Sequence, residues 1–305
     1  MSAITSVFNT RLFCSFWLPG MLLLLLACES KKTTQPENNF ITVTDDLGRK
    51  VRVPQYPKRV MALAPSATEM LYAVADEKTI VGRTQNCDYP AQVKDKPVVN
   101  NYPMDYERLV LLKPDIVFAV AGIISLEIAA KLQDLNIPVY YQDFKKVADV
   151  FRGLQDMGRL LHREKEAQRV VDSLQQELDK LQVTSSGPKL RVLAITWHDP
   201  IYVYGQNTLF TDKLRYLGAE NAVTEVFPQP YPALTREYIL KLNPDVLVGG
   251  TPEEMEKTFF AQYPELKKIK AYQQKRIFKA TDNLMSRPGP RVVASIRELK
   301  AFLAK

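Results

Sequence analysis

The sequence predicts an α/β protein of two similar lobes joined by a helical segment. In both halves of the chain, strand-like apolar runs alternate with helical stretches, which is typical of parallel sheets covered by helices. Between the halves, from residue 147, the apolar positions recur with the period of a helix. A helix–turn–strand pattern in the first half also recurs in the second. With 305 residues, the chain is long enough for two domains of ordinary size.

The first lobe is expected over residues 41–146. Polar and apolar residues alternate on either side of Asp46-Leu47-Gly48-Arg49, which predicts a hairpin of residues 41–45 and 50–53. Ser66 opens a helix, and Glu69 predicts a capping box in which the two side chains satisfy first-turn amides reciprocally. The other elements expected here are strands at 59–63, 116–120 and 139–141 and a helix at 126–135.

Two helices are expected in the linking segment, residues 147–186. The first begins at Val147, and a polar break at His162-Arg163 separates it from the second, over residues 164–182. At about 1.5 Å per residue, the second helix would be roughly 28 Å long, which is about the width of a small lobe. The run Ser185-Ser186-Gly187-Pro188 ends it.

The second lobe is expected over residues 187–305, with its first strand at 190–195. The strongest sign that it repeats the first lobe is the match between Glu107–Phe118 and Glu237–Val248, which lie 130 residues apart. The glutamate, the apolar positions and a Pro-Asp pair coincide. Convergent turn chemistry would also produce a helix, a Pro-Asp turn and a buried strand. Agreement along the whole segment favours duplicated lobes.

The N-terminus has the pattern of an export signal. One basic residue, Arg11, precedes an apolar stretch that is too short and too broken for an ideal membrane span, so residues 1–27 are expected to be a signal peptide. The stretch ends in Leu25-Leu26-Ala27-Cys28, which resembles the bacterial lipoprotein processing motif. By that resemblance, Cys28 becomes the acylated first residue of the mature chain. The alternative is an ordinary secretory signal that contains a cysteine.

Residues 28–40 are expected to form a tether, because they include no large apolar side chain before Phe40. Acyl chains on Cys28, at about 0.8 kcal/mol per buried methylene, would hold a soluble domain firmly on a bilayer. Cys14 would be removed with the signal peptide. Cys87 would then remain without a disulfide partner in the mature chain, even in an oxidising compartment.

Composition argues against several classes of function. The net charge of +7 is mild and the basic residues are scattered among acids, so no nucleic-acid surface is expected. With only two histidines, His162 and His198, a histidine-built metal site is not expected either. Residues 64–68 lack the glycine of a phosphate-binding loop, and neither histidine has a Gly-x-Ser-x-Gly elbow to serve. We therefore expect a binding protein and not an enzyme.

Several short motifs occur together over residues 41–305. They are Asp46-Leu47-Gly48-Arg49, Pro65-Ser66-Ala67-Thr68-Glu69, Val81-Gly82, Cys87-Asp88-Tyr89-Pro90, Lys113-Pro114-Asp115, Asn243-Pro244-Asp245 and Arg287-Pro288-Gly289-Pro290-Arg291. As a set, they resemble the ABC-transporter solute-binding proteins of the siderophore, haem and cobalamin family. The resemblance implies a class III periplasmic binding protein, with two Rossmann-like lobes joined by a long rigid helix.

The resemblance also implies partners and a ligand. The protein would be monomeric, extracytoplasmic and lipid-anchored to a bacterial membrane, and it would deliver its ligand to an ABC permease dimer with ATPase subunits. The stretch Cys87-Asp88-Tyr89-Pro90 is most similar to the cobalamin-binding branch, which implies cobalamin or another corrinoid as ligand and no resident cofactor. A ferric siderophore or haem is the alternative. For haem, Tyr89, Tyr102 or His198 would serve as axial ligand.

Candidate ligand-binding residues follow from the rule that open parallel sheets bind ligands beyond the carboxyl ends of their strands. A broad, partly flat ligand needs aromatic faces for stacking and polar groups for its rim. Tyr202 and Tyr231 match positions where cobalamin-binding members have aromatic contacts, whereas Asn101 stands where they have a stacking tryptophan. Arg287 has the donor geometry for a ligand rim, with pairing to a nearby acid as the alternative. For each aromatic candidate, packing in the core is the alternative. The full set is Asn86, Tyr89, Asn101, Tyr102, Trp197, Tyr202, Tyr231, Asp282 and Arg287.

Glu107 and Glu237 are candidates for contact with a transporter. Each lies in the first turn of the repeated helix, where a carboxylate stabilises the helix dipole by about 0.3–1 kcal/mol. In the family that the chain resembles, acids at the matching positions dock onto arginines of the membrane subunits. The resemblance therefore implies that Glu107 and Glu237 dock onto the transporter, one from each lobe.

Overall fold

The computed structural model describes residues 39–183 and 187–304. These described residues belong to one compact unit. The predicted signal peptide, Cys28 and most of the predicted tether lie outside the described residues. Among the helices that the structure describes, none is both long enough and apolar enough to cross a membrane.

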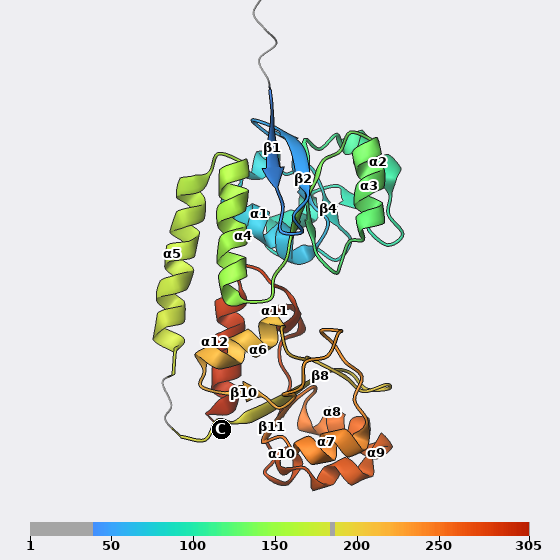
Figure 1. Cartoon of the computed structure of the whole chain (residues 1–305), viewed down its shortest axis with the longest axis vertical. Coiled ribbons are helices and arrows are strands. Elements are labelled where there is room, and N and C mark those ends of the chain that lie inside the picture. Colours follow the sequence, from blue (N-terminus) through green and yellow to red (C-terminus); the bar gives the residue numbers. More distant parts are fainter. Residues whose placement is uncertain (1–38, 184–186, 305) are drawn as a thin grey trace, which may run out of the picture. The chain divides into compact units, whose positions relative to one another are not determined.

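The first lobe, which carries the labels β1, β2, β4 and α1 to α3 in Figure 1, is built on a three-stranded parallel sheet. Its strands, in spatial order, are β3 (Val60–Ala62), β6 (Ile116–Val120) and β7 (Val139–Gln142). The predicted hairpin is confirmed as β1 (Phe40–Thr44) and β2 (Lys50–Pro54), and β4 (Arg83–Thr84) pairs with β5 (Val98–Val99). The helices are α1 (Pro65–Val74), α2 (Tyr106–Leu112) and α3 (Leu126–Asp134), with 3₁₀ turns η1 (Glu77–Thr79) and η2 (Ala91–Asp95).

The second lobe repeats this plan on a longer sheet. Its parallel strands, in spatial order, are β10 (Glu220–Asn221), β8 (Arg191–Trp197), β11 (Val246–Val248) and β12 (Ile277–Phe278), and β9 (Tyr202–Val203) pairs antiparallel with β8. The first helices are α6 (Leu209–Tyr216), α7 (Arg236–Leu242), α8 (Pro252–Lys257) and α9 (Phe259–Gln262). After them come η3 (Pro264–Lys268), α10 (Lys270–Gln273), α11 (Asp282–Ser286) and α12 (Val292–Leu303).

Alternation along the strands explains why helices cover both faces of each sheet. In β3, Val60 and Ala62 pack into one apolar cluster, whereas Met61 packs into another on the opposite face. In β8, Val192 belongs to the cluster of Val60, and Leu193 belongs to a third cluster within the second lobe. Strands that are apolar on both faces require cover on both faces, as the sequence pattern predicts.

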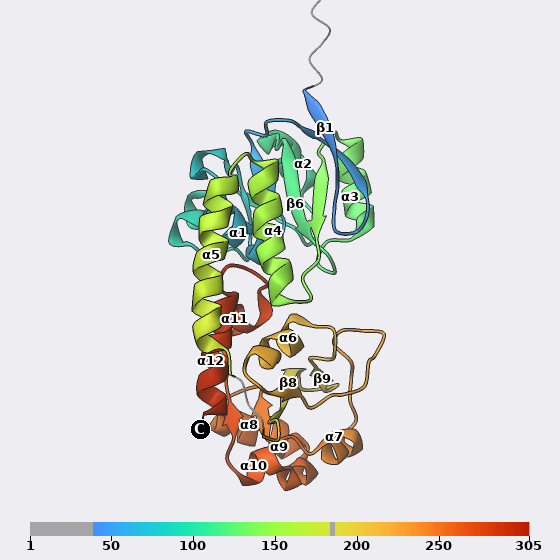
Figure 2. The same cartoon turned by 60° about the vertical axis from the view of Figure 1, so that its left-hand side comes forward.

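The linking segment forms two helices, α4 (Val147–Leu160) and α5 (Glu164–Leu181), as predicted. Figure 2 shows α5 running beside α4 and then beside α12. Two contacts tie α5 to α12: the Lys300 Nζ donates to Leu181 O at 3.0 Å, and Arg297 pairs with Glu177 at 2.6 Å. One apolar cluster contains side chains of both sheets and of α4, α5, α6 and α12. The lobes are therefore joined through a continuous core.

The predicted sequence repeat is also a repeat of structure. Helices α2 and α7 end in residues of left-handed conformation, Lys113 (φ 45°) and Asn243 (φ 44°). Each is followed by the Pro-Asp pair, and the aspartates bind the strand that lies next to them. Asp115 accepts from Arg59 N at 2.9 Å, and Asp245 accepts from Arg191 N at 3.0 Å. The Pro-Asp turn thus sets the register of β3 against β6 and of β8 against β11.

The expected capping box at the start of α1 is wrong. The helix begins at Pro65 with Ala64 as its N-cap, and no side chain caps it. Proline suits the first helical position because its missing N–H has no partner to lose there. The hydroxyl of Ser66 is buried without a hydrogen-bond partner among the described residues, and Glu69 points elsewhere. Its partners lie in the second lobe.

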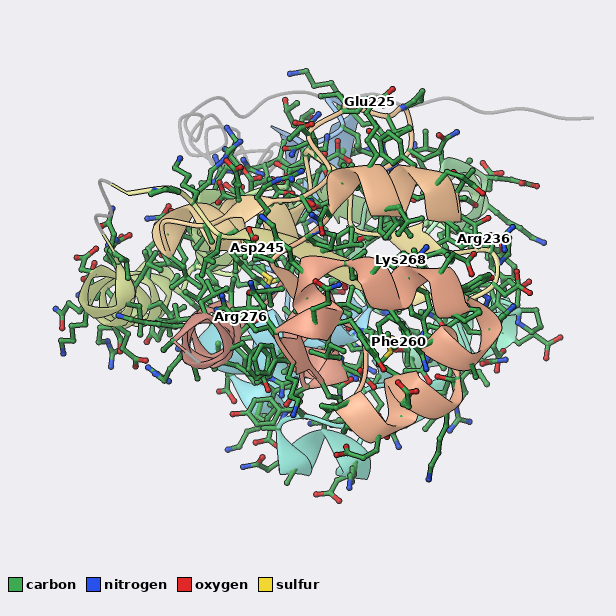
Figure 3. All side chains as sticks on the ribbon, turned by 90° about the horizontal axis from the view of Figure 1, so that it is seen from below. Glu225, Arg236, Asp245, Phe260, Lys268 and Arg276 are labelled. Atoms are coloured by element: carbon green, nitrogen blue, oxygen red, sulfur yellow. The ribbon has the colours of Figure 1, made fainter. Side chains whose placement is uncertain are left out.

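The outer helices of the second lobe carry mixed charges (Figure 3). Arg236 of α7 pairs with Glu265 of η3 at 2.9 Å, and Lys270 of α10 lies 3.4 Å from Asp245. Beneath these helices, Phe260 of α9 is fully buried. Basic side chains paired with acids in this way are typical of a solvated surface.

Candidate ligand-binding cleft

A cavity of about 660 Å³ is lined by both lobes. The first lobe contributes the start of α1 and the loop between β4 and η2, and the second lobe contributes α11 and the residues after it. Such a position, beyond the carboxyl ends of the strands, is where open parallel sheets bind ligands. The lining residues are Pro65, Ser66, Gln85, Asn86, Asp88, Ile123, Asn283, Ser286, Arg287 and Pro288.

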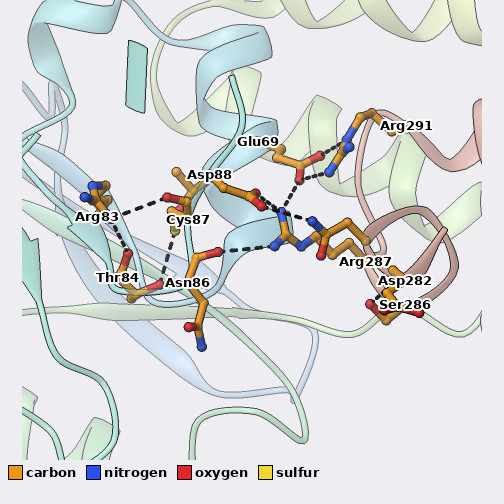
Figure 4. Close-up of polar contacts among 12 residues, drawn as sticks. Glu69, Arg83, Thr84, Asn86, Cys87, Asp88, Asp282, Ser286, Arg287 and Arg291 are labelled. Carbon is orange, nitrogen blue, oxygen red and sulfur yellow. Dashed lines mark hydrogen bonds and ion pairs between the residues drawn. The ribbon is translucent and has the colours of Figure 1, made fainter. Parts of the chain in front are cut away.

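An ionic cluster joins the lobes at the wall of this cavity (Figure 4). Glu69 of α1 accepts from Arg291 in a bidentate pair, Nη2 to Oε1 at 2.6 Å and Nε to Oε2 at 2.8 Å. The Arg287 Nη1 donates to Glu69 Oε1 at 3.1 Å. The Glu69 side chain is 1% exposed, so the carboxylate is buried with two guanidinium groups around it. Such charge-assisted bidentate pairs are the strong hydrogen bonds of proteins.

Asp88 completes the cluster from the loop after β4. Its carboxylate accepts from Arg287 Nη1 and, at 3.0 Å, from Asn283 Nδ2 of α11. The Arg287 Nη2 also donates to Asn86 O at 3.2 Å. The hydrogen bond and the charge of Arg287 lower the pKa of Asp88 against the opposing effect of burial. Asp88 is therefore ionised at neutral pH, and its pair with Arg287 spans the two lobes.

Two further contacts fit the Arg287–Arg291 loop onto the first lobe. The guanidinium of Arg291 lies 4.4 Å from the centre of the Tyr89 ring, which is a cation–π distance. A Cβ atom at Gly289 would lie only 3.3 Å from Ser66 O, so glycine permits the loop to approach the first turn of α1 closely. This loop is the segment of the sequence motif Arg-Pro-Gly-Pro-Arg, and its function in the fold is to bridge the lobes.

Helix α11, which carries the second-lobe side of the cavity, is held at both ends by other side chains. The buried Lys213 of α6 donates to Leu284 O at 3.3 Å and Met285 O at 3.2 Å. Burial lowers the pKa of Lys213 to about 7. At the other end, Glu298 of α12 accepts from Thr281, from its N–H at 3.1 Å and from its hydroxyl at 2.7 Å. The position of α11 is thus fixed by the packing of α6 and α12.

Three of the predicted ligand-binding residues lie at this cavity or next to it. Asn86 and Arg287 line it. Asp282 occupies the first turn of α11, immediately before the lining residue Asn283. Of the two alternatives for Arg287, pairing with acids is what the structure contains, and the acids are Glu69 and Asp88.

Two predicted residues of the first lobe, Asn101 and Tyr102, differ in how their side chains are held. Asn101 is held by the lobe itself, because its Nδ2 donates to Leu63 O at 3.0 Å and its Oδ1 accepts from Gln85 at 2.7 Å. The neighbouring Tyr102 is 89% exposed. Neither residue lines the cavity. Tyr89 does not line it either, but its ring is half-exposed beside the cluster through Arg291.

The three predicted aromatics of the second lobe lie at its first strand pair. Trp197 of β8 is paired with Tyr202 of β9, and Tyr202 forms a bridge with Ala233. The Tyr231 ring meets the Tyr204 ring edge to face at 5.4 Å. All three side chains are exposed, Trp197 most of all at 64%, and none lines the 660 Å³ cavity. They are exposed on the second lobe outside this cavity.

A second cavity, of about 360 Å³, lies where α4 meets the second lobe. Its charged lining residues are Lys145, Lys146, Arg215 and Asp212, so positive charge is in excess. Asp212 of α6 accepts from Val147 N at 2.8 Å, which caps the start of α4 from the second lobe. The other lining residues are Gln206, Asn207, Thr208, Thr211, Phe227, Pro228 and Pro230.

Sequence reasoning missed most residues of the site, among them Gln85 and Ser286 of the lining and the members of the polar cluster Glu69, Asp88, Asn283 and Arg291. The spacing of Ser66 and Glu69 predicts a local helix cap, which gives Glu69 no role at the site. Asp88 and Arg291 belong to motifs that the sequence analysis singled out, and the available signal was a charged residue within two positions of a proline in each motif. Within the described residues, no group of three or more His, Cys, Asp or Glu side chains is placed to hold a metal ion. Cys87 is buried and free.

Glu107 and Glu237 occupy equivalent exposed positions in the first turns of α2 and α7. The residues before these helices, Asp105 and Thr235, cap them with their side chains. The pKa of Glu237 is lowered by a backbone N–H and by the Thr235 hydroxyl, so its carboxylate is ionised at neutral pH. Each lobe therefore presents one acid at the same point of the repeated helix.

Comparison with known proteins shows which family this architecture belongs to. The family model described as "Periplasmic binding protein" matches residues 60–284. An uncharacterized ABC transporter substrate-binding lipoprotein of Bacillus subtilis is 28% identical over 89% of this chain and 88% of its own length. The vitamin B12-binding protein of Pectobacterium carotovorum is 27% identical over 80% of this chain and 87% of its length.

A solved structure from Staphylococcus epidermidis, described as a possible iron-binding (periplasmic solute-binding) protein, is 28% identical. It matches with a TM-score of 0.73 over 82% of this chain and 99% of that chain. The architecture is that of class III periplasmic binding proteins. The two α/β lobes, the cavity between them and the family match over most of the chain lead to one conclusion: the chain belongs to the periplasmic binding protein family, whose members bind solutes for transport and are not enzymes.

Proposed function

We propose that this protein is the extracytoplasmic substrate-binding component of an ABC importer, which captures a cobalamin-type corrinoid between its lobes and delivers it to a permease. The observation that carries the proposal is the cavity of about 660 Å³ that both lobes line. The vitamin B12-binding proteins among its relatives, whose lengths the chain covers well, support the choice of ligand.

The chemistry of the two cavities suits a corrinoid. Such a ligand has a broad ring with a rim of uncharged amides and one phosphodiester. The larger cavity has amide and hydroxyl groups from Gln85, Asn86, Asn283 and Ser286, and its charges are balanced. The smaller one has an excess of basic side chains, which suits a single negative charge. Exposed rings at Tyr202 and Tyr231 supply faces for stacking.

A ferric siderophore or haem is the alternative cargo. The likeness to the possible iron-binding protein of Staphylococcus epidermidis supports it. Haem needs an axial ligand, for which Tyr89 and Tyr102 are accessible. Burial lowers the pKa of His198, so its imidazole is neutral at pH 7, the form that ligates iron.

Calorimetry with cyanocobalamin, haem and ferric siderophores tests the proposal. We expect cyanocobalamin to bind at a stoichiometry of one. Tyr231→Ala should weaken binding by about 1–3 kcal/mol, the scale for losing an aromatic contact in a binding site. Tyr56→Ala is the matched control, because Tyr56 is also exposed but stacks on His162, whereas Tyr231 directly follows Pro230, which lines the smaller cavity. Tight binding of haem or a siderophore without any cobalamin signal would favour the alternative cargo.

We also propose that Glu107 and Glu237 orient the protein on a permease of two subunits, and that the lipid anchor keeps it on the membrane. Paired, separated charges fix orientation and speed encounter more than they add affinity. The double change to Ala should leave ligand binding within about 0.5 kcal/mol and reduce uptake and co-purification with the permease. Glu127→Ala with Glu253→Ala is the matched control, since these exposed acids also lie in first turns, one in each lobe. Normal uptake by a folded double variant would exclude the docking role.

A further inference from the structure

Two arginines at the wall of the 660 Å³ cavity are matched by two carboxylates. Glu69 and Asp88 each pair with Arg287, and Glu69 also pairs with Arg291. The cluster therefore carries no net charge. Asp282, at the start of the neighbouring helix α11, adds a further negative charge close by.

Only one pair of the cluster faces the cavity. Asp88 and Arg287 are lining residues, whereas Glu69 and Arg291 stand behind the wall. Three of the five N–H donors of Arg287 have partners, Nη1 with the carboxylates of Glu69 and Asp88 and Nη2 with Asn86 O. The Asp88 side chain is 49% exposed, and that of Arg287 only 12%. A ligand that enters the cavity therefore meets the carboxylate first.

The Asp88–Arg287 pair should disfavour the binding of anionic groups but not of uncharged ones. An anionic group that approaches Arg287 also comes close to the Asp88 carboxylate, because Asp88 is bonded to that guanidinium and is the more exposed side chain of the pair. Like charges brought together in a partly desolvated site repel each other. An amide or hydroxyl group has no such conflict, because Asn86, Asn283 and the carboxylate itself offer it donors and acceptors.

We propose that Asp88 determines the charge class of the ligand: by neutralising Arg287 at the cavity wall, it selects a ligand with an uncharged hydrogen-bonding rim and rejects one with several carboxylates. This inference rests on the proposed function, in that the cavity is the ligand site. It extends that function by assigning specificity to one residue. Glu69 holds Arg287 in place from behind, and Asp88 sets the charge that the ligand meets.

The test uses two pairs of probes that differ in charge but hardly in shape. One pair is dicyanocobyrinic acid, with seven carboxylates, and its heptaamide. The other is haem, with two carboxylates, and its dimethyl ester. For each pair, the ratio of the Kd of the anionic probe to that of the neutral probe is measured by calorimetry on the full chain purified in detergent, at two salt concentrations.

Asp88→Asn should lower this ratio about tenfold or more, mainly by tightening the anionic probe, and the change should shrink at high salt because salt screens the charges. Asn283→Asp adds a carboxylate to the lining and should raise the ratio. Asp95→Asn is the control, because it makes the same change in net charge at an exposed residue of η2 outside the cavity. Thermal unfolding checks that each variant is folded, and Asp88→Ser provides a second neutral replacement.

The outcomes separate the inference from the proposed function. If the corrinoid pair does not bind but Asp88→Asn lowers the ratio for the haem pair, the corrinoid proposal fails and the role of Asp88 stands. If a corrinoid binds and the ratio is the same in Asp88→Asn, or falls equally in Asp95→Asn, the inference is wrong and the corrinoid function remains. Wild-type protein that prefers the anionic member of both pairs also overturns it.

Discussion

Removal of the charge of Glu69 should destabilise the protein more than the same change would at a residue of α1 with only local contacts. Glu69→Gln keeps the shape of the side chain but leaves Arg287 and Arg291 facing each other without their shared carboxylate. Removing one partner of a buried ion pair costs about 3–5 kcal/mol. The arginine side chains are 12% and 23% exposed, so water relieves part of this cost and we take about 3 kcal/mol. At about 2–4 °C per kcal/mol for a chain of this size, Tm should fall by about 6–12 °C.

Calorimetric unfolding of Glu69→Gln against Glu127→Gln measures this effect. Glu127 is an exposed first-turn acid of α3, so its change should stay within about 0.5 kcal/mol. The variants Arg291→Met and Glu69→Gln with Arg291→Met complete a double-mutant cycle, and the coupling between the two sites should exceed about 1 kcal/mol. A Tm of Glu69→Gln equal to that of the wild type, or additive single changes, would refute the reasoning that the cluster joins the lobes energetically.

Two further predictions concern the buried lysine and the N-terminus. Burial lowers the pKa of Lys213 in the folded protein to about 7, so the unfolded chain binds the extra proton between pH 7 and about 10.5. The free energy of unfolding of the wild type, relative to that of Lys213→Met, should therefore rise with pH over this range, by up to about 1.4 kcal/mol per pH unit. Denaturant unfolding of both proteins at pH 7, 8 and 9 measures this difference, and a difference that does not change with pH would contradict the prediction. Mass spectrometry of protein from the native membrane should find an acylated Cys28 as the first residue, and an unlipidated N-terminus elsewhere would exclude the anchor.

Local chemistry explains why much of the fold could be predicted. The hairpin around Asp46–Arg49 and the helices of the linking segment depend on periods of a few residues and on turn-forming side chains. The repeat was visible because each lobe needs the same turn to join its helix to its strand. Asp115 and Asp245 confirm this, since both accept from the backbone of the neighbouring strand. Such interactions leave a pattern in the adjacent sequence.

The site depended on contacts that no local pattern contains. Ser66 and Glu69 have the spacing of a capping box, and the spacing alone could not show that Pro65 starts the helix earlier. Glu69 bonds to Arg287 and Arg291, which lie 218 and 222 residues away in the chain. A buried carboxylate is stable only with cationic partners, and only the packing of α11 and α12 against the first lobe supplies them. The sequence by itself determined the two lobes, the helices that link them, and the set of short motifs that indicates the protein family. Tertiary structure decided which charges meet across the cavity, because that depends on how separately folded segments pack.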